Sequence, residues 1–90
     1  MAESGSTFEV NGHTLTVDAE ARDSWEVFDL MCEVGPDMSV FDMPVAFRIV
    51  EACTGVGKDA FVEMCGGKRV HRDVVLDHLT EALTALFPKN

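Results

Sequence analysis

The chain has 90 residues, which suits about one domain, and its 47% hydrophobic and 26% charged residues are typical of a globular protein. Sixteen acidic residues against seven lysines and arginines give a formal net charge of −9, which opposes general binding to nucleic acids or anionic membranes. No apolar run approaches the ~20 residues of a membrane-spanning helix, and residues 1–7 lack the basic and apolar stretches of a secretion signal. We expect a disordered lead over 1–7, a single globular domain over 8–87 and a C-terminal tail over 88–90.

A β-hairpin is predicted at the start of the domain. Residues 8–10 and 14–17 alternate apolar and polar side chains around Asn11-Gly12, a pair that tolerates the positive φ angles of a type I′ turn. This register places Phe8 opposite Leu15 and Val10 opposite His13. One face of the hairpin is then apolar and must pack on a helix.

The first helix is expected to begin between Asp18 and Ser24, with Asp18 or Asp23 as its cap, and to end at Gly35-Pro36. One apolar stripe runs along it at helical spacing and is interpreted as the core side, with Trp25 and Phe28 as core residues. The residues of this stripe are Trp25, Phe28, Met31 and Cys32, and Val27, Leu30 and Val34 widen it.

Three further helices are predicted between glycine-bearing turns. The second runs from Ser39 or Asp42 to Thr54, the third over residues 58–64, and the fourth from His71 or Arg72 to Phe87. The fold class is therefore α+β and mostly α: an N-terminal hairpin followed by about four short helices, in a single layer over the hairpin.

No catalytic, cofactor or metal site is indicated. The segment Thr54 to Asp59 resembles a phosphate-binding loop, but the required glycine is replaced by Ala52, and Asp59 stands where a hydroxyl is needed. Cys65, His71 and His78 lack the close pairing of zinc ligands. The three cysteines, Cys32, Cys53 and Cys65, are expected to be buried thiols in a reducing cytoplasm. We expect no enzymatic activity and no cofactor.

Two sets of residues are candidates for contacts with partners. Met38, Phe41 and Met43 are expected to form an exposed apolar set, because methionine adapts to varied apolar surfaces and Phe41 lies off the stripe of the second helix. Lys68, Arg69 and Arg72 form a basic cluster. Residues 1–45 carry ten acidic residues and one basic residue, so this cluster suits head-to-tail self-association with a second copy.

The order of these elements resembles the tail assembly chaperones of long-tailed bacteriophages. The resemblance covers residues 8–87. It rests on the hairpin Phe-Glu-Val-Asn-Gly, the helix opening Asp23-Ser24-Trp25-Glu26-Val27-Phe28, the apolar helix that ends at Gly55, and Gly67-Lys68-Arg69-Val70 before an amphipathic last helix. One departure is His71, which stands where the family pattern has a Ser or Thr cap.

The resemblance implies a non-enzymatic protein of the bacterial host cytoplasm. Such chaperones coat the long tape measure protein, whose apolar helices otherwise aggregate, and tail tube subunits then replace them. Many weakly bound copies on one long chain benefit from avidity, and an acidic exterior keeps the coated rod in solution.

A small acidic interaction protein is the alternative, either a DNA mimic or an antitoxin-like adaptor. A mimic requires a regular exposed row of carboxylates. Glu26, Asp29, Glu33 and Asp37 recur every three or four residues along the first helix, as such a row would, and as the solvent side of an ordinary helix also does.

Overall fold

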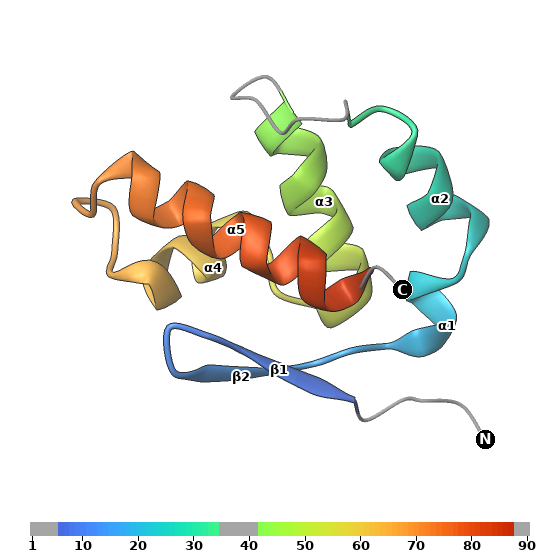
Figure 1. The fold of residues 1–90 in the computed structure, drawn as a ribbon, viewed down its shortest axis with the longest axis horizontal. Coiled ribbons are helices and arrows are strands. Elements are labelled where there is room, and N and C mark those ends of the chain that lie inside the picture. The colour runs from blue at the N-terminus through green and yellow to red at the C-terminus, as the bar shows by residue number, and fades with distance from the viewer. Residues whose placement is uncertain (1–5, 35–41, 88–90) are drawn as a thin grey trace.

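The computed structural model describes residues 6–34 and 42–87. Two strands and five helices follow one another within these ranges (Figure 1). They are β1 (Thr7–Val10), β2 (His13–Thr16), α1 (Ala19–Arg22), α2 (Trp25–Met31), α3 (Met43–Thr54), α4 (Lys58–Cys65) and α5 (Arg72–Leu86). The fold class predicted from the sequence, a hairpin followed by a mostly helical domain, is confirmed.

The hairpin has the predicted register. Phe8 pairs with Leu15 and Val10 with His13, and Asn11 and Gly12 take φ angles of 50° and 83°, as a type I′ turn requires. Thr7, expected in the lead, belongs to β1, and the Ser6 carbonyl accepts a hydrogen bond from the Val17 N–H at 2.8 Å.

The predicted first helix is two helices, because the chain supplies two caps in succession. The Asp18 carboxylate accepts hydrogen bonds from the N–H groups of Glu20 and Ala21 and begins α1. Ser24 then adopts an extended backbone, and its hydroxyl oxygen accepts from the Val27 N–H to begin α2. α2 ends at Met31, and the expected stop at 35–36 lies outside the described residues.

The three later helices lie where the sequence predicts them. α3 starts with Pro44 in its first turn and ends at Gly55, which has the left-handed φ of 80° common after helices. α5 has an unusual cap: the Nδ1 atom of His71 accepts a hydrogen bond from the Asp73 N–H at 3.1 Å. His71 therefore acts as an N-cap, a role that Ser, Thr, Asp or Asn more commonly has.

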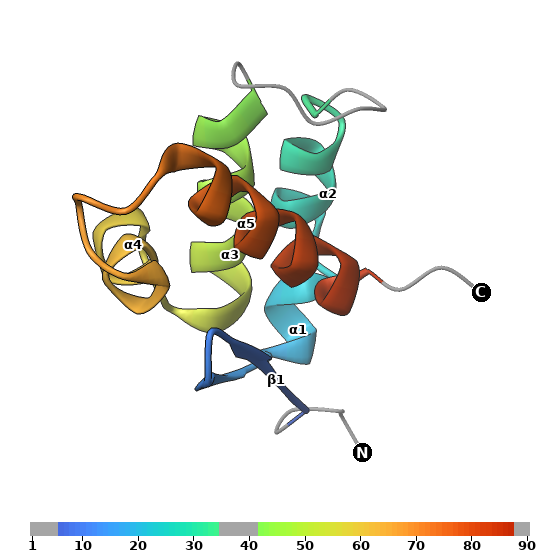
Figure 2. The ribbon, with the colours of Figure 1, turned by 60° about the vertical axis from the view of Figure 1, so that its left-hand side comes forward.

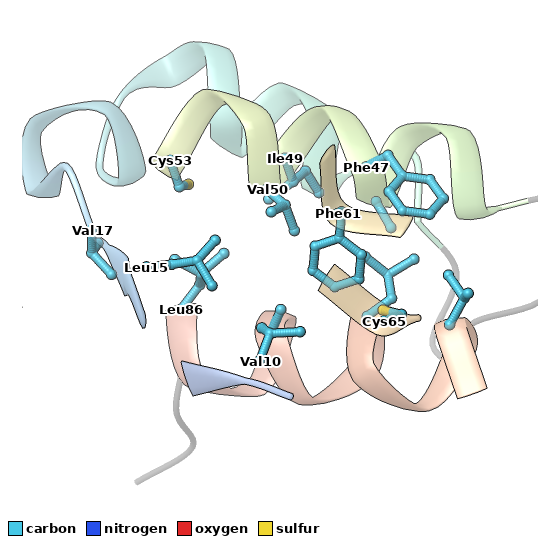
Figure 3. Packing of buried hydrophobic residues seen from close by; sticks show 14 of the residues in the cluster. Val10, Leu15, Val17, Phe47, Ile49, Val50, Cys53, Phe61, Cys65 and Leu86 are labelled. Atoms are coloured by element: carbon cyan, nitrogen blue, oxygen red, sulfur yellow. The ribbon is translucent and has the colours of Figure 1, made fainter. Parts of the chain in front are cut away.

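The core lies between α3 and α5, with the hairpin and α4 closing its sides (Figure 3). The helices therefore do not form the expected single layer over the hairpin. Phe61 of α4 is fully buried and meets Phe47 of α3 edge to face, with ring centroids 5.8 Å apart. The Asn11 side chain ties the hairpin turn to α4 by donating to the Met64 carbonyl at 2.8 Å.

α2 lies at the margin of this arrangement. It packs beside α3 and contributes Val27, which is fully buried, and the partly buried Leu30, and Val34, just beyond its end, is also partly buried against the core. Figures 1 and 2 show α2 on the outer side of α3, and within 6–34 and 42–87 no further helix or strand covers its outer side. The tertiary structure thus leaves one side of α2 free for contact with another molecule.

Candidate partner-binding surface

The side of α2 that faces away from the core is apolar. Trp25 is 72% exposed, Phe28 52% and Met31 36%, and Cys32 at the end of the helix is also exposed. These four residues follow one another at spacings of three, three and one, which places them on one side of the helix. We call them the exposed α2 face.

The expectation that Trp25 and Phe28 are core residues is wrong. Apolar side chains occupy two neighbouring sides of α2, and the side that carries Val27, Leu30 and Val34 is the one that packs against the core. Sequence periodicity gives no preference between two adjacent apolar stripes, because both have helical spacing. Contact with α3 decides between them.

The two aromatic rings of the exposed α2 face pack against each other. Their centroids lie 5.2 Å apart, with 38° between the ring planes, so they form one continuous apolar surface. Aromatic side chains offer about 150–250 Å² each, and Trp25 is 72% and Phe28 52% exposed. A partner that covers the exposed part of both gains roughly 5–8 kcal/mol at ~25 cal/mol per Å², before entropic costs. Such a surface can anchor an apolar partner.

The expected apolar set Met38, Phe41 and Met43 is only partly described. Met38 and Phe41 lie outside the described residues. Met43 is half-buried at the start of α3, packs against the core, and lines an open hollow of about 340 Å³ together with Arg72, Asp73 and Leu76. The structure therefore brings Met43 next to Arg72 of the basic cluster.

The basic cluster itself is exposed. Lys68 and Arg69 lie in the turn between α4 and α5, and Arg72 is the first residue of α5. Over 6–34 and 42–87, none of the three forms an ion pair with a carboxylate. Figure 1 shows this turn at the opposite end of the molecule from α2.

The cysteines differ in their surroundings. Cys53 and Cys65 are buried in the core, as expected, whereas Cys32 is exposed, which corrects the expectation that all three thiols are buried. Burial raises the pKa of the Cys53 thiol from 9.0 to about 11, an effect that nearby Arg22 partly offsets, while the carboxylates of Asp18 and Asp23 raise it further. Burial also raises the pKa of Cys65. Neither thiol is poised as a nucleophile.

The loop that resembles a phosphate-binding motif is a connection between helices. The Thr54 hydroxyl donates to the Val50 carbonyl and accepts from the Val56 N–H, so its hydrogen bonds are local. A Cβ atom placed on Gly57 would lie 3.3 Å from Oε2 of Glu51. A carboxylate at this position opposes the binding of a phosphate.

Other kinds of site find no support among residues 6–34 and 42–87. No group of three His, Cys, Asp or Glu side chains is arranged to hold a metal ion. The described helices are all too short or too polar to cross a bilayer.

Neither a scan against protein-family models nor searches of curated proteins and of solved structures find a match to this chain.

Proposed function

We propose that this protein is a non-enzymatic tail assembly chaperone that binds apolar helical segments of a phage tape measure protein. The observation that carries the proposal is the exposed α2 face, where Trp25 and Phe28 present two packed aromatic rings to solvent. An exposed apolar patch on a small acidic domain is typical of a surface that binds another protein. The order of the hairpin and helices resembles that of these chaperones, and this resemblance is the reason for naming the tape measure protein as the partner.

The charge of the chain suits this role. Asp18, Glu20 and Asp23 are exposed on or beside α1, and Glu26, Asp29 and Glu33 are exposed along or just beyond α2. Copies bound along one tape measure protein present an acidic surface to solvent and to other coated chains, and like charges repel. The coat then keeps the apolar client dispersed until tail tube subunits replace it.

Self-association belongs to the same proposal. Lys68, Arg69 and Arg72 lie at the end of the molecule opposite α2, and the exposed carboxylates on and beside α1, those of Glu20 and Asp23, lie at the other end. A head-to-tail contact between copies brings opposite charges together and extends along a rod-like client. Each contact is weak, and the client supplies the avidity.

A test is co-expression with the phage tape measure protein that this proposal expects as the client. We expect the wild-type chain to increase the amount of tape measure protein in the soluble fraction and to copurify with it. The double variant Trp25→Ser/Phe28→Ser is expected to lose both effects while it remains folded. The control is Ala60→Ser, which changes an exposed apolar residue on α4, away from the exposed α2 face.

The outcomes separate the chaperone from the acidic alternatives. If the wild-type chain leaves the tape measure protein insoluble, or if the double variant protects it as well as the wild type does, the proposal fails. Capture of a DNA-binding protein that added DNA displaces would favour the DNA mimic. The exposed α2 face argues against that alternative, because a mimic of phosphate rows has no need of aromatic rings beside its carboxylates.

A further inference from the structure

An acidic groove runs beside the exposed α2 face. It lies between α2 and α3, which pack side by side (Figures 1 and 2), and it is an open hollow of about 380 Å³. Its lining residues are Glu26, Asp29 and Leu30 from α2, and Arg48, Glu51 and Ala52 from α3. We call this hollow the acidic groove.

The groove carries an excess of negative charge. Three carboxylates, from Glu26, Asp29 and Glu51, face one guanidinium, that of Arg48, and all four residues are exposed. Among the described residues, Arg48 is within ion-pair distance of none of these carboxylates. The groove therefore retains unpaired acceptors for a cation from another molecule.

Apolar and acidic parts of the groove are combined in a way that suits one type of side chain. Leu30 and Ala52 supply apolar lining, and both are partly buried. Lysine and arginine have aliphatic stems that pack on apolar surfaces and charged ends that stay at the polar rim. A hollow lined by Leu30 and Ala52 and by three carboxylates therefore matches both parts of such a side chain.

The groove shares a border with the exposed α2 face. Asp29 follows Trp25 by four residues, so the two side chains are neighbours on the surface of the helix. Glu26, Asp29 and Glu33 repeat at three and four residues, the same spacing at which Trp25, Phe28 and Cys32 repeat. A helix lying along α2 therefore meets an apolar row and a parallel acidic row.

We propose that the acidic groove receives a lysine or arginine side chain from the edge of the apolar face of a bound amphipathic helix. The proposal rests on the proposed function, in which the exposed α2 face binds an apolar helical segment, and it adds the charge that this segment must carry. Charge complementarity selects the occupant: a helix with Lys or Arg beside its apolar face satisfies both rows, and one with Glu or Asp there is repelled.

The test uses three synthetic helical peptides with the same leucine-rich face and with Lys, Gln or Glu along one edge. Trp25 is the only tryptophan and lies on the contact surface, so its fluorescence reports binding directly. We expect the Lys peptide to bind most tightly and the Glu peptide most weakly. The difference is expected to shrink at high salt, because exposed charges are screened over about 10 Å at 0.1 M.

Variants of the groove assign the effect to its residues. Glu26→Gln and Glu51→Gln are each expected to weaken binding of the Lys peptide about two- to five-fold, in line with single exposed ion pairs. Arg48→Gln is expected to tighten it by a similar factor, because it removes a cation from the groove. Asp77→Asn on α5 neutralises an exposed carboxylate elsewhere and is the control.

The possible results distinguish the two proposals. Equal binding of the three peptides, together with loss of binding in Phe28→Ser/Met31→Ser, a variant that keeps the Trp25 reporter, overturns the groove and leaves the exposed α2 face as the binding surface. Absence of binding by every peptide overturns both. A gain in affinity from Arg48→Gln that is confined to the Lys peptide supports the groove, because altered folding would affect all three peptides alike.

Discussion

The backbone N–H of Asp18 donates a hydrogen bond to the carbonyl oxygen of Cys53 at 2.8 Å, which joins the start of α1 to the last turn of α3. The Asp18 carboxylate also caps α1, so one residue fixes both the position and the beginning of this helix. α2 begins after a break of two residues, so its location depends on that of α1. A contact between residues 35 positions apart, Asp18 and Cys53, thus helps to place the start of α2 beside α3, and packing against α3 then buries Val27 and leaves Trp25 exposed.

The first prediction concerns the exposed α2 face. Trp25→Ser/Phe28→Ser is expected to change the free energy of unfolding by no more than about 0.5 kcal/mol, because exposed side chains contribute little to folding. Urea unfolding followed by circular dichroism measures this change. In the wild-type chain, Trp25 fluorescence is expected to be quenched readily by acrylamide. Strong destabilisation with poor quenching would instead place Trp25 in the core.

The second prediction is a loss of stability in alkaline solution that originates at Cys53. The folded thiol has a pKa of about 11, against 9.0 for an unperturbed cysteine thiol, because burial disfavours the thiolate. Below pH 9 the thiol is protonated in both states, so its full contribution to stability is present. As the pH rises from 9 to 11, the unfolded chain loses its proton first and stability falls, by about 2–3 kcal/mol at most.

Comparison with Cys53→Ala isolates this effect. The variant is less stable at every pH because it leaves a small cavity in the core. Its free energy of unfolding is nevertheless expected to decline less between pH 9 and 11 than that of the wild type. Parallel declines in the two proteins would show that Cys53 does not cause the pH dependence.

The third prediction concerns the cap of α5. Ser and Asp are among the preferred residues at this position, and His71 holds it with a hydrogen bond of 3.1 Å to the Asp73 N–H. His71→Ser is expected to keep or raise the free energy of unfolding by up to about 1 kcal/mol, and His71→Ala to lower it by about 1 kcal/mol. Thermal unfolding of the three proteins at one pH gives the order. A His71→Ala variant as stable as the wild type would exclude a capping role.

The fourth prediction concerns self-association. Sedimentation velocity at low ionic strength is expected to show larger species than at high salt, because the contact joins exposed opposite charges. Lys68→Gln/Arg69→Gln/Arg72→Gln is expected to weaken association about ten-fold, taking each of three exposed pairs at about 0.5 kcal/mol. Lys58→Gln, an exposed lysine on α4, is the matched control.

A mixing experiment tests the head-to-tail geometry of that contact. A second variant, Glu20→Gln/Asp23→Asn, neutralises exposed carboxylates at the opposite end of the molecule and leaves the acidic groove unchanged. Each variant alone is expected to sediment as a monomer, and a mixture of the two as a one-to-one dimer, because each retains the end that the other lacks. Association of either variant by itself would contradict a head-to-tail contact between these two ends.

Local signals in the sequence determine most of the elements. Asn11-Gly12 fixes the hairpin turn because both residues adopt positive φ angles, and Gly55 ends α3 for the same reason. Glycines and caps act on their own neighbours, so their effects can be read without knowledge of the tertiary fold. The hairpin register and the limits of α3, α4 and α5 accordingly agree with the sequence prediction to within one or two residues.

Long-range packing decides which apolar residues are buried, and the sequence alone does not. α2 has two apolar sides, and only contact with α3 determines that Val27 is buried while Trp25 and Phe28 face solvent. The acidic groove likewise requires Glu26 and Asp29 to lie next to Arg48 and Glu51, which come from a different helix. Periodicity reports the spacing of residues along one helix and carries no information on which neighbour that helix meets. The elements of this protein are therefore set by its sequence, and its candidate binding surface by its tertiary structure.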